Sequence, residues 1–488
     1  MTASLTELPE LLEPMVPHDD QEEAIAFILE HKAVLLKAPT GAGKTLVGVE
    51  TAIRSGAQRV LIVGPLNTES SWRKTVARQT EYEVELKYCH TKRVANKRHL
   101  EDLHSGKPGW YFIGREFFKN FSWKKVKGLD CIIFDECHVA TNRDTKMWKM
   151  LMTSMAPIKL AMSATPAGNK LEGIWALARW LWPKKTPRGF WNWITQYFTT
   201  EFDPHAVKVL PDGTKLKGKK VTGEAQPGLM WSELPAAYKM PSVYKDKPTI
   251  HEIEVELSAT QRKHYKDLEE EAITWLDNHP LAVDIPAVLH MRLRQLCLAV
   301  PSVRQDWVKR KDKDTGLWED VWGDVVWFED DAKSTKIDAL IELLGDLYAE
   351  KPFPVVVYTD SRIFATICTK QLQEKGFNAR RFVGGMPADE RAWKKDMFGE
   401  AYDVVVCTIP AVAEGLDGWQ YVCDTEVWMN YTYSNVLNHQ AEGRVSRQGQ
   451  TRSVQRYVIK AKDTVEVRQI GKLKSDAQKL AEGYGDED

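Results

Sequence analysis

The chain has 488 residues, 43% of them hydrophobic and 28% charged, which indicates about two to four globular domains with buried cores. Its net charge of −1 and isoelectric point of about 6.9 exclude a uniformly basic surface, although a nucleic-acid motor needs only a local basic groove. The sequence has neither a basic start followed by an apolar stretch nor an apolar run of about 18 residues. It therefore predicts neither secretion nor membrane insertion.

The cysteines are scattered and no two of them have CxxC spacing, which argues against zinc and against a disulfide framework. Four of the seven lie in or beside runs typical of strands, so we expect buried free thiols in a reducing compartment. The predicted location is cytoplasmic, in a bacterial cell or, for a viral protein, in its host. The seven are Cys89, Cys131, Cys137, Cys297, Cys368, Cys407 and Cys423.

Tryptophan is unusually abundant, with 18 residues. Five of them crowd into one short segment, at spacings that favour helical packing in a core. Stacking on the bases of a single-stranded nucleic acid is the functional alternative. The five are Trp175, Trp180, Trp182, Trp191 and Trp193.

Short apolar runs alternate with segments of helical spacing in the first part of the chain. The runs predict strands over residues 33–36, 59–63, 111–113, 131–134 and 160–162. A helix is predicted over Thr45–Ser55, with Gly56 as its C-cap. Strands that alternate with helices indicate an α/β fold with a parallel sheet covered on both faces.

The last third of the chain repeats this rhythm, so we expect a second α/β lobe. Strands are predicted over residues 354–358, 379–383, 403–407 and 426–429, and helices near 336–349, 361–375, 387–398 and 435–447. The expected domains are a first lobe over 1–202, an inter-lobe region over 203–332, a second lobe over 333–480 and a tail over 481–488. The acidic end from Gly483 onward is expected to fray.

Two hairpins are predicted in the inter-lobe region. Residues 207–217 alternate across an Asp-Gly turn, and this hairpin is either a solvated surface element or a contact to a nucleic-acid backbone. A second hairpin-like segment over 309–327 turns at residues 314–316, and no function is assigned to it. The first hairpin is basic because it contains Lys215, Lys217, Lys219 and Lys220.

A phosphate-binding loop is predicted at Ala38-Pro39-Thr40-Gly41-Ala42-Gly43-Lys44-Thr45, between a predicted strand and a predicted helix. The glycines let successive backbone N–H groups turn toward phosphates at the start of the helix. Lys44 can neutralise phosphate oxygens, and the hydroxyl of Thr45 can ligate Mg²⁺. The segment departs from the general pattern at Ala38, where glycine is usual.

An acidic pair, Asp135 and Glu136, follows the predicted strand over 131–134. At the carboxyl end of a parallel strand, Asp135 can hold Mg²⁺ on the side opposite Thr45. Glu136 can then orient and deprotonate the attacking water. Acidic strand ends are common, so the pair gains its meaning from the phosphate loop upstream. His138 is interpreted as a packing or relay residue.

A polar amide and two arginines, Gln440, Arg444 and Arg447, recur at offsets of four and three, which would place all three on one helix face. Two guanidinium groups beside an amide suit a γ-phosphate whose charge must be met in the transition state. A salt-bridged surface helix is the alternative for this segment taken alone.

Taken in order, these segments resemble the motifs of the superfamily-2 helicases, and within them the Swi/Snf-type DNA translocases. The similarity runs from about Gln21 to Thr464. Residues 38–45 resemble motif I, and Asp135–His138 resembles motif II, a DEAH-type box with cysteine in its third place. Ser163-Ala164-Thr165-Pro166 is similar to motif III, residues 64–68 followed by Trp72 to motif Ia, and Gln21 to the glutamine that reads adenine.

The second part of the chain continues the resemblance. Residues 355–361 resemble motif IV, Thr408 with residues 413–417 resembles motif V, and residues 440–450 resemble motif VI. The similarity to the Swi/Snf type depends on four shorter segments, at residues 169–177, 257–263, 293–297 and 334–336.

The resemblance implies two RecA-like parallel-sheet lobes of the P-loop NTPase class, with an ATP cleft between them. It implies a nucleic-acid-stimulated ATPase that uses ATP and Mg²⁺ and moves on DNA, whether duplex, single-stranded or branched. The implied roles are ATP binding by Gln21, residues 38–45 and Asp417; catalysis by Lys44, Glu136, Gln440, Arg444 and Arg447; Mg²⁺ binding by Thr45 and Asp135; coupling by Ser163, Ala164 and Thr165; and nucleic-acid contact by Thr68, Ser361 and Thr408.

Two departures from the family pattern limit these implications. The paired arginines expected before the inter-lobe segment are replaced by Tyr238-Lys239-Met240, and the large insertions of eukaryotic remodellers are missing. Both favour a compact bacterial or viral version without nucleosome remodelling. An RNA helicase and a nucleotide-gated scaffold that clamps nucleic acid are the alternatives. Nothing in the sequence requires more than a monomer.

Overall fold

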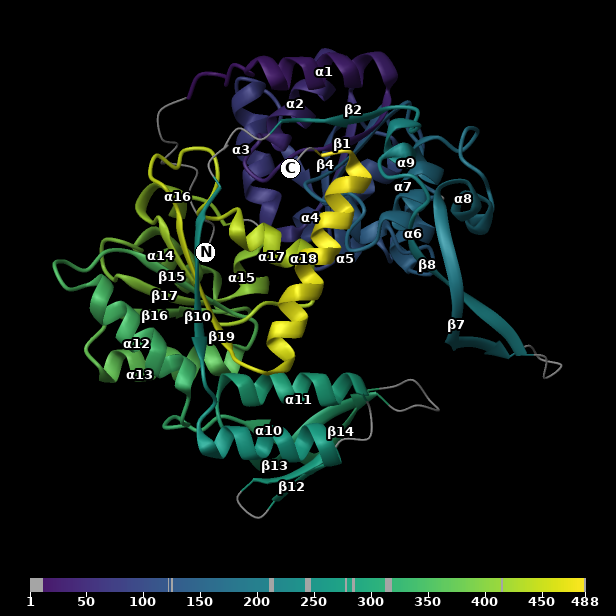
Figure 1. Ribbon diagram of the computed structural model, residues 1–488. Helices are drawn as coiled ribbons and strands as arrows, with labels where there is room; N and C mark the ends of the chain where they lie inside the picture. The colour runs from purple at the N-terminus through teal and green to yellow at the C-terminus, as the bar shows by residue number, and fades with distance from the viewer. Residues whose placement is uncertain are drawn as a thin grey trace. The chain divides into compact units, whose positions relative to one another are not determined.

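The computed structural model describes residues 12–121, 123, 126–209, 215–241, 247–276, 279–282, 286–311, 318–413 and 416–486. They form two compact units (Figure 1). Unit 1 comprises Met1–Val243 and Asp476–Asp488, and unit 2 comprises Tyr244–Ser475. None of the helices in the described part of the chain combines the length and the apolar character that a bilayer span requires.

Unit 1 is built on a parallel sheet. Within the described residues its seven strands follow the order β3-β4-β2-β5-β6-β1-β9, with every neighbouring pair parallel. β2 and β5 are buried along their whole length, as expected for strands covered on both faces. The strands are β1 (Ala33–Lys37), β2 (Arg59–Gly64), β3 (Leu86–Tyr88), β4 (Gly109–Gly114), β5 (Cys131–Asp135), β6 (Ile158–Ser163) and β9 (Ala237–Lys239).

The five strands predicted for this unit are confirmed, and the short edge strands β3 and β9 were not predicted. The predicted helix after the phosphate loop is confirmed as α2. In this unit α7 packs on β1 and β6, and α5 packs on β2 and β4. The helices are α1 (Asp19–His31), α2 (Lys44–Arg54), α3 (Glu69–Gln79), α4 (Val94–Ser105), α5 (Arg115–Phe118), α6 (Lys146–Leu151), α7 (Ile174–Leu181), α8 (Phe190–Tyr197) and α9 (Leu229–Ser232); the 3₁₀ turns are η1 (Leu66–Thr68), η3 (Cys137–Ala140) and η4 (Leu171–Gly173).

The crowded tryptophans mostly fill the core of unit 1. Trp175, Trp180, Trp182 and Trp193 are all buried, which confirms the packing interpretation for these four. Trp191 is exposed. All seven cysteines are buried free thiols, as predicted.

The first predicted hairpin is confirmed and is longer than the sequence pattern indicated. β7 (Phe198–Val209) pairs with β8 (Lys215–Glu224) in antiparallel register, with irregularities after Thr199 and after Asp203. Figure 1 shows this ribbon reaching away from the sheet of unit 1. The predicted Asp-Gly turn lies outside the described residues. Of the basic residues, Lys219 and Lys220 are described and exposed.

Unit 2 contains a second parallel sheet. Its six strands in the described residues follow the order β10-β19-β18-β15-β17-β16, again with parallel neighbours throughout. The four strands predicted for this lobe are confirmed, whereas β10 and β19 were not predicted. The strands are β10 (Thr249–Val255), β15 (Val355–Thr359), β16 (Ala379–Phe382), β17 (Val404–Thr408), β18 (Thr425–Trp428) and β19 (Gln455–Ala461).

One helix prediction in unit 2 is wrong at its end. Residues 435–447 were expected to be helical, but α17 ends at Glu442, before Gly443. The chain then continues through short turns, in which the N–H groups of Arg444 and Arg447 bond to carbonyls two or three residues earlier. The helices are α10 (Ala259–Glu271), α11 (Pro286–Leu298), α12 (Thr335–Leu347), α13 (Arg362–Glu374), α14 (Ala388–Asp396), α15 (Ile409–Ala413), α16 (Trp419–Val422), α17 (Asn435–Glu442) and α18 (Val465–Tyr484), the last of which ends in unit 1.

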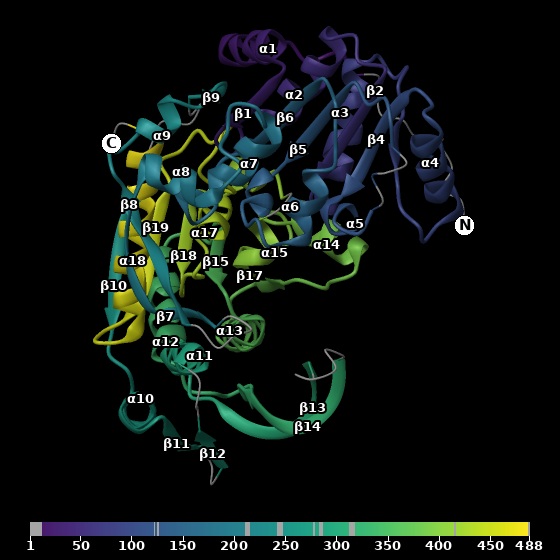
Figure 2. The ribbon, with the colours of Figure 1, turned by 90° about the vertical axis from the view of Figure 1, so that its right-hand side faces the viewer.

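Two antiparallel hairpins accompany α10 and α11 in unit 2. β11 (Ile273–Leu276) pairs with β12 (His279–Ala282), and β13 (Ser302–Lys311) pairs with β14 (Trp318–Trp327). The second pair confirms the hairpin predicted over 309–327, whose turn lies outside the described residues. Figure 2 shows β13 and β14 as a curved two-stranded ribbon.

The acidic end of the chain is docked on unit 1, so the expectation that it frays is wrong for its described residues. The ring of Tyr484 is buried and meets the indole of Trp231 edge-on at 5.0 Å. The carboxylate of Asp486 contacts the amino groups of Lys37 at 2.7 Å and Lys239 at 3.0 Å. Two cations therefore hold an acidic residue that the sequence alone showed only as part of a polar tail.

A buried ion pair joins the elements of unit 2. Lys336 in α12 is fully buried, and its amino group lies 2.7 Å from the carboxylate of Glu466 in α18. The same amino group donates to the carbonyl oxygens of Ile459 in β19, at 2.9 Å, and of Met429, just after β18. One side chain thus satisfies polar groups from three elements.

We predict that Lys336→Met destabilises unit 2 by about 3–5 kcal/mol, because it leaves the carboxylate of Glu466 buried without its cation. Calorimetry of the full chain should show one transition lowered by roughly 10 °C. Lys370→Met removes an exposed ion pair with Asp330 and is the matched control, with an expected shift of about 1 °C or less. Equal melting of both variants would contradict the stabilising role of the buried pair.

Candidate functional site

The predicted phosphate loop connects β1 to α2. Gly41 and Gly43 have φ angles of 84° and 74°, in the left-handed region that favours glycine, and Gly43 is the N-cap of α2. The amino group of Lys44 donates to the carbonyl oxygens of Ala38 and Pro39, each at 3.0 Å. These bonds hold the cation within the curve of the loop, where phosphate oxygens can take over from the carbonyl oxygens.

Gln21 contacts the phosphate loop directly. The side chain is buried in α1, and its Nε2 donates to the carbonyl oxygen of Ala42 at 3.1 Å. A Cβ atom on Gly43 would lie 2.1 Å from this nitrogen, so position 43 accepts only glycine while Gln21 stays in place. The structure thus brings Gln21 and the loop together, and the reading of adenine by Gln21 stays a prediction.

Asp135 ends β5 and is held by two N–H donors. The indole Nε1 of Trp72 in α3 donates to one carboxylate oxygen at 3.2 Å, and the backbone N–H of Glu136 donates to the other at 3.0 Å. The side chain of Trp72 is fully buried and packs against α2, the helix that follows the phosphate loop. The contact is close at Gly48, where an added Cβ atom would lie 3.0 Å from the indole ring. These bonds orient the carboxylate at the edge of the sheet where the phosphate loop also lies.

Glu136 is linked to the segment predicted for coupling. Its backbone is left-handed, with φ of 51°, and its carboxylate accepts a hydrogen bond from the hydroxyl of Ser163 at 2.9 Å. The Nδ1 atom of His138 lies 3.2 Å from the same carboxylate and 3.1 Å from the hydroxyl of Ser163. The oxygen of Ser163 also accepts the backbone N–H of Thr165 at 3.1 Å. Motifs II and III therefore share one hydrogen-bonded cluster, in which His138 contacts both Glu136 and Ser163.

The two carboxylates have opposite pKa shifts. Burial and the adjacent charge of Glu136 raise the pKa of Asp135 above its usual value. Burial also opposes ionisation of Glu136, but the hydrogen bond and charge of His138, with help from Lys44, outweigh it and lower the pKa of Glu136. Negative charge is thus favoured on Glu136, the residue predicted to act as a base, and a cation beside Asp135 would favour the charged form there as well.

The three residues predicted to contact nucleic acid have local structural roles. The hydroxyl of Thr68 donates to the carbonyl oxygen of Pro65 at 2.8 Å. The hydroxyl of Ser361 accepts the N–H of Phe364 at 3.2 Å and caps α13, and Thr408 is buried at the end of β17. Their contact with nucleic acid stays a prediction.

The two arginines of motif VI differ in their surroundings. Arg444 is buried and donates to the carbonyl oxygen of Leu416 at 2.6 Å and to that of Ala413, so it ties motif VI to motif V. Arg447 lies 3.2 Å from the carboxylate of Asp417, whose side chain is 69% exposed. Gln440 is buried in α17. Both arginines thus reach the carbonyl oxygen of Leu416, at 2.6 and 3.5 Å, and Arg447 also reaches Asp417. Residues 414–415, just before this segment, lie outside the described residues.

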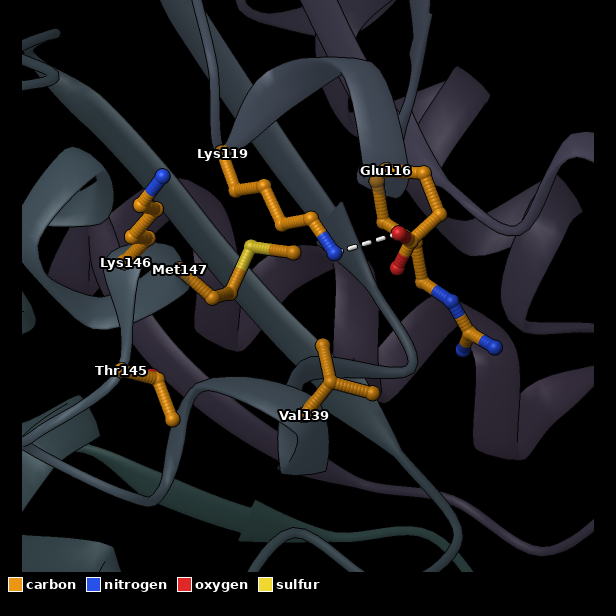
Figure 3. A pocket seen from close by; sticks show the side chains of 7 residues that line it. Glu116, Lys119, Val139, Thr145, Lys146 and Met147 are labelled. Atoms are coloured by element: carbon orange, nitrogen blue, oxygen red, sulfur yellow. Dashed lines mark hydrogen bonds and ion pairs between the residues drawn. The ribbon is translucent and has the colours of Figure 1, made fainter. Parts of the chain in front are cut away.

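A pocket of about 480 Å³ opens beside α5 and α6 in unit 1 (Figure 3). Figure 3 shows the amino group of Lys119 directed at the carboxylate of Glu116, with Val139 and Met147 beside this pair. The pocket follows β4 and β5, whose carboxyl ends lie at the same edge of the sheet as the phosphate loop. Its lining contains three cations and one acid and is formed by Arg115, Glu116, Lys119, Val139, Thr145, Lys146 and Met147.

Sequence reasoning gave no role to two residues of this site. Trp72 was recognised only as part of a motif, and its bond to Asp135 joins segments 63 residues apart. Tyr484 accepts the N–H of Ala167, directly after motif III, at 2.8 Å. Trp72 follows soon after a predicted strand, and the alternation of strands and helices could therefore have placed it near the carboxyl edge of the sheet. No sequence signal pointed to Tyr484.

Comparison with known proteins identifies two families. The family described as DEAD/DEAH box helicase matches residues 18–174, and the helicase conserved C-terminal domain matches residues 335–449. The first match contains Gln21, the phosphate loop and the acidic pair, and the second contains Gln440, Arg444 and Arg447.

Similar proteins come from bacteria and eukaryotes. "Uncharacterized ATP-dependent helicase YqhH" of Bacillus subtilis is 22% identical over 94% of this chain and 78% of the relative. "Protein CHROMATIN REMODELING 24" of Arabidopsis thaliana is 22% identical over 84% of this chain, and "ATP-dependent helicase brm" of Drosophila melanogaster is 24% identical over 73%. The chain spans only 40% and 22% of the length of these two relatives.

Proposed function

Because the chain belongs to the superfamily-2 helicases of the Swi/Snf-like kind and uses ATP, we propose that it couples Mg²⁺-dependent ATP hydrolysis to movement along DNA. The observation that carries the proposal is the joint placement of the phosphate loop and the acidic pair. β1 and β5 flank β6 on its two sides, so their carboxyl ends lie at one edge. Lys44 acts electrostatically on both Asp135 and Glu136.

The residues at this edge fit Mg²⁺. Asp135 offers a carboxylate that two N–H donors orient, and Thr45 offers a hydroxyl in the first turn of α2. Oxygen ligands of this kind are those that Mg²⁺ prefers. When bound, the cation supplies charge neutralisation for the phosphates and the leaving oxygen.

Glu136 takes the proton from the attacking water in this proposal. Its low pKa keeps it ionised, and the hydrogen bond from Ser163 fixes the carboxylate. Because Ser163 also binds the N–H of Thr165, a change in motif III is transmitted to the base. Lys44 holds the phosphates through charge.

In unit 2 we assign the two arginines different roles. Arg447 has a solvent-exposed partner in Asp417, which it can leave to meet the charge on the γ-phosphate in the transition state. Arg444 is bonded to two carbonyl oxygens of motif V and is assigned to holding that motif. Gln440 and Asp417 complete the nucleotide contacts of this unit in the proposal.

The choice of DNA is supported by the relatives named for chromatin remodelling and by the short Swi/Snf-like segments. The basic pocket of unit 1, with Arg115, Lys119 and Lys146, supplies cations for backbone phosphates at the edge that also carries the ATP site. We place the protein in the cytoplasm, in keeping with its buried free thiols. An RNA helicase and a nucleotide-gated clamp are the competing functions.

The deciding measurement is steady-state ATP hydrolysis with duplex, single-stranded and forked DNA and with RNA. We predict strong stimulation by DNA, and for Glu136→Gln a turnover lower by about 10²–10⁴-fold with ATP binding retained, because only the proton acceptor is lost. Stronger stimulation by RNA would replace DNA as the track. Nucleotide binding without turnover in the wild type would favour the clamp, and turnover indifferent to every nucleic acid would refute movement along one.

We predict that Arg447→Ala lowers turnover by about 10³-fold with little change in melting temperature, because a transition-state contact is lost. Arg444→Ala should instead lower the melting temperature, since the carbonyl oxygen of Ala413 loses its side-chain donor and that of Leu416 keeps only the longer contact to Arg447, at 3.5 Å. Turnover within about threefold of wild type for Arg447→Ala would reduce that residue to a partner of Asp417.

We predict that Trp72→Phe weakens nucleotide binding by about tenfold in the presence of Mg²⁺ and leaves binding in EDTA unchanged, because one donor to Asp135 is lost while the ring is kept. Titration of a fluorescent ADP analogue measures both affinities. Trp180→Phe is the matched control, since it removes an indole bond to Ser154 elsewhere in unit 1. An equal change in both variants would contradict a role at the metal site.

A further inference from the structure

The β13–β14 hairpin leaves the core of unit 2 as a lone ribbon. Val303 and Val326 pair across its base and are buried in a cluster with Tyr265 of α10 and Leu293 of α11. Among the described residues, no third strand pairs with either β13 or β14. Among the described residues of the ribbon, Val303 and Val326 are the ones that belong to this buried cluster.

Two tryptophans lie opposite each other on the free part of this ribbon. Trp307 and Trp322 are directly paired in the strand register. Their ring centroids are 5.3 Å apart at an interplanar angle of 73°, and the residues are 65% and 55% exposed. Trp307 follows Val303 by four residues, and Trp322 precedes Val326 by four. Because side chains alternate along a strand, the two tryptophans lie on the same face of the ribbon as the two valines. A polar pair, Gln305 and Asp324, separates the two tryptophans from the buried valines on this face, so the indole rings form an aromatic site of their own away from the core.

This pair differs from the other tryptophans of the chain. Among the described residues, Trp191 and Trp393 are also exposed, but the ring beside each of them is not: Phe190 beside Trp191 is half-buried and Tyr402 beside Trp393 is buried. The edge-to-face arrangement leaves the outer face of at least one indole open to a flat partner. Trp327 on the opposite face of the ribbon already has such a partner, because the guanidinium of Arg304 lies 3.9 Å from its ring centre.

The charge of the hairpin argues against binding through phosphates. Residues 302–327 contain five lysines and arginines against six aspartates and glutamates. A ribbon whose positive and negative charges nearly balance does not attract the phosphate backbone of a nucleic acid. Its distinctive chemistry is the pair of exposed aromatic faces.

We propose that the Trp307–Trp322 pair is a stacking site for unpaired nucleobases. The proposal rests on the proposed function, which supplies a nucleic acid as the polymer that the enzyme follows. Aromatic side chains stack on bases of any sequence, and only unpaired bases expose their faces. The site therefore distinguishes single-stranded or forked segments from intact duplex, a discrimination that contacts to the backbone do not provide.

The test uses the full chain carrying Trp307→Ala together with Trp322→Ala. Anisotropy titrations compare a labelled single strand, the same strand without bases, and a blunt duplex. We expect the double variant to bind the single strand at least about tenfold more weakly, with binding of the abasic strand and the duplex unchanged. The ratio between wild type and variant should stay constant from about 50 to about 200 mM salt, because no phosphate contact is lost.

Three controls make the result specific. The double phenylalanine variant keeps aromatic faces and should recover most of the affinity for the single strand. Trp393→Ala removes an exposed tryptophan elsewhere in unit 2 and should change nothing. Duplex-stimulated ATP hydrolysis should be preserved in all variants, which shows that they are folded.

Several outcomes would overturn the proposal. An equal loss for the single strand, the abasic strand and the duplex would mean a general backbone surface. Unchanged affinities would mean that the pair does not touch nucleic acid, and a change in sedimentation of the free protein would mean that the pair joins two copies of the chain. If nucleic acid stimulates ATP hydrolysis by the wild type but the double variant binds single strands as well as the wild type does, the stacking proposal is wrong and the proposed function stands. If no nucleic acid stimulates hydrolysis by the wild type, the proposed function is wrong as well.

Discussion

The parallel pairing of β6 with both β1 and β5 is the constraint on which the chemistry of unit 1 depends. Its register sets Lys37 beside Ser163 and Asp135 beside Met162, so the ends of three strands meet at successive positions of one edge. A slip by one residue would turn each side chain to the opposite face and separate the loop, the acidic pair and motif III. The continuous apolar strands that fix this register are thus a condition for the site as much as for the fold.

The two buried carboxylates at this edge are each surrounded by hydrogen-bond donors. Asp135 has two N–H donors, and Glu136 has a hydroxyl and an imidazole within reach. In unit 2 the buried guanidinium of Arg444 is likewise satisfied, here by carbonyl oxygens that accept its hydrogen bonds. Arg447 instead pairs with Asp417, which is exposed. The difference separates charged groups that are enclosed by hydrogen-bond partners from one whose partner is exposed.

Sequence patterns predicted what depends on local order. The central strands follow from apolar runs, and the phosphate loop follows from glycines placed between a strand and a helix. β10 and β19 escaped prediction because neither has the continuous apolar pattern of a central strand. The end of α17 falls at Gly443, a local signal that the helix prediction passed over. The bond between Trp72 and Asp135 depends on neighbours distant in sequence, which periodicity cannot show. The docked tail was missed for the same reason, since Lys37 and Asp486 stand 449 residues apart.

The two ends of the chain contribute to the same unit, with the whole of the other unit between them. During translation, Lys37 and Lys239 are therefore synthesised before unit 2, and Asp486, whose carboxylate contacts both lysines, is synthesised after it. Unit 1 can begin to fold early, but its contacts at Tyr484 and Asp486 form only after unit 2 has been synthesised. The last packing contacts of unit 1 thus wait for unit 2 to be made.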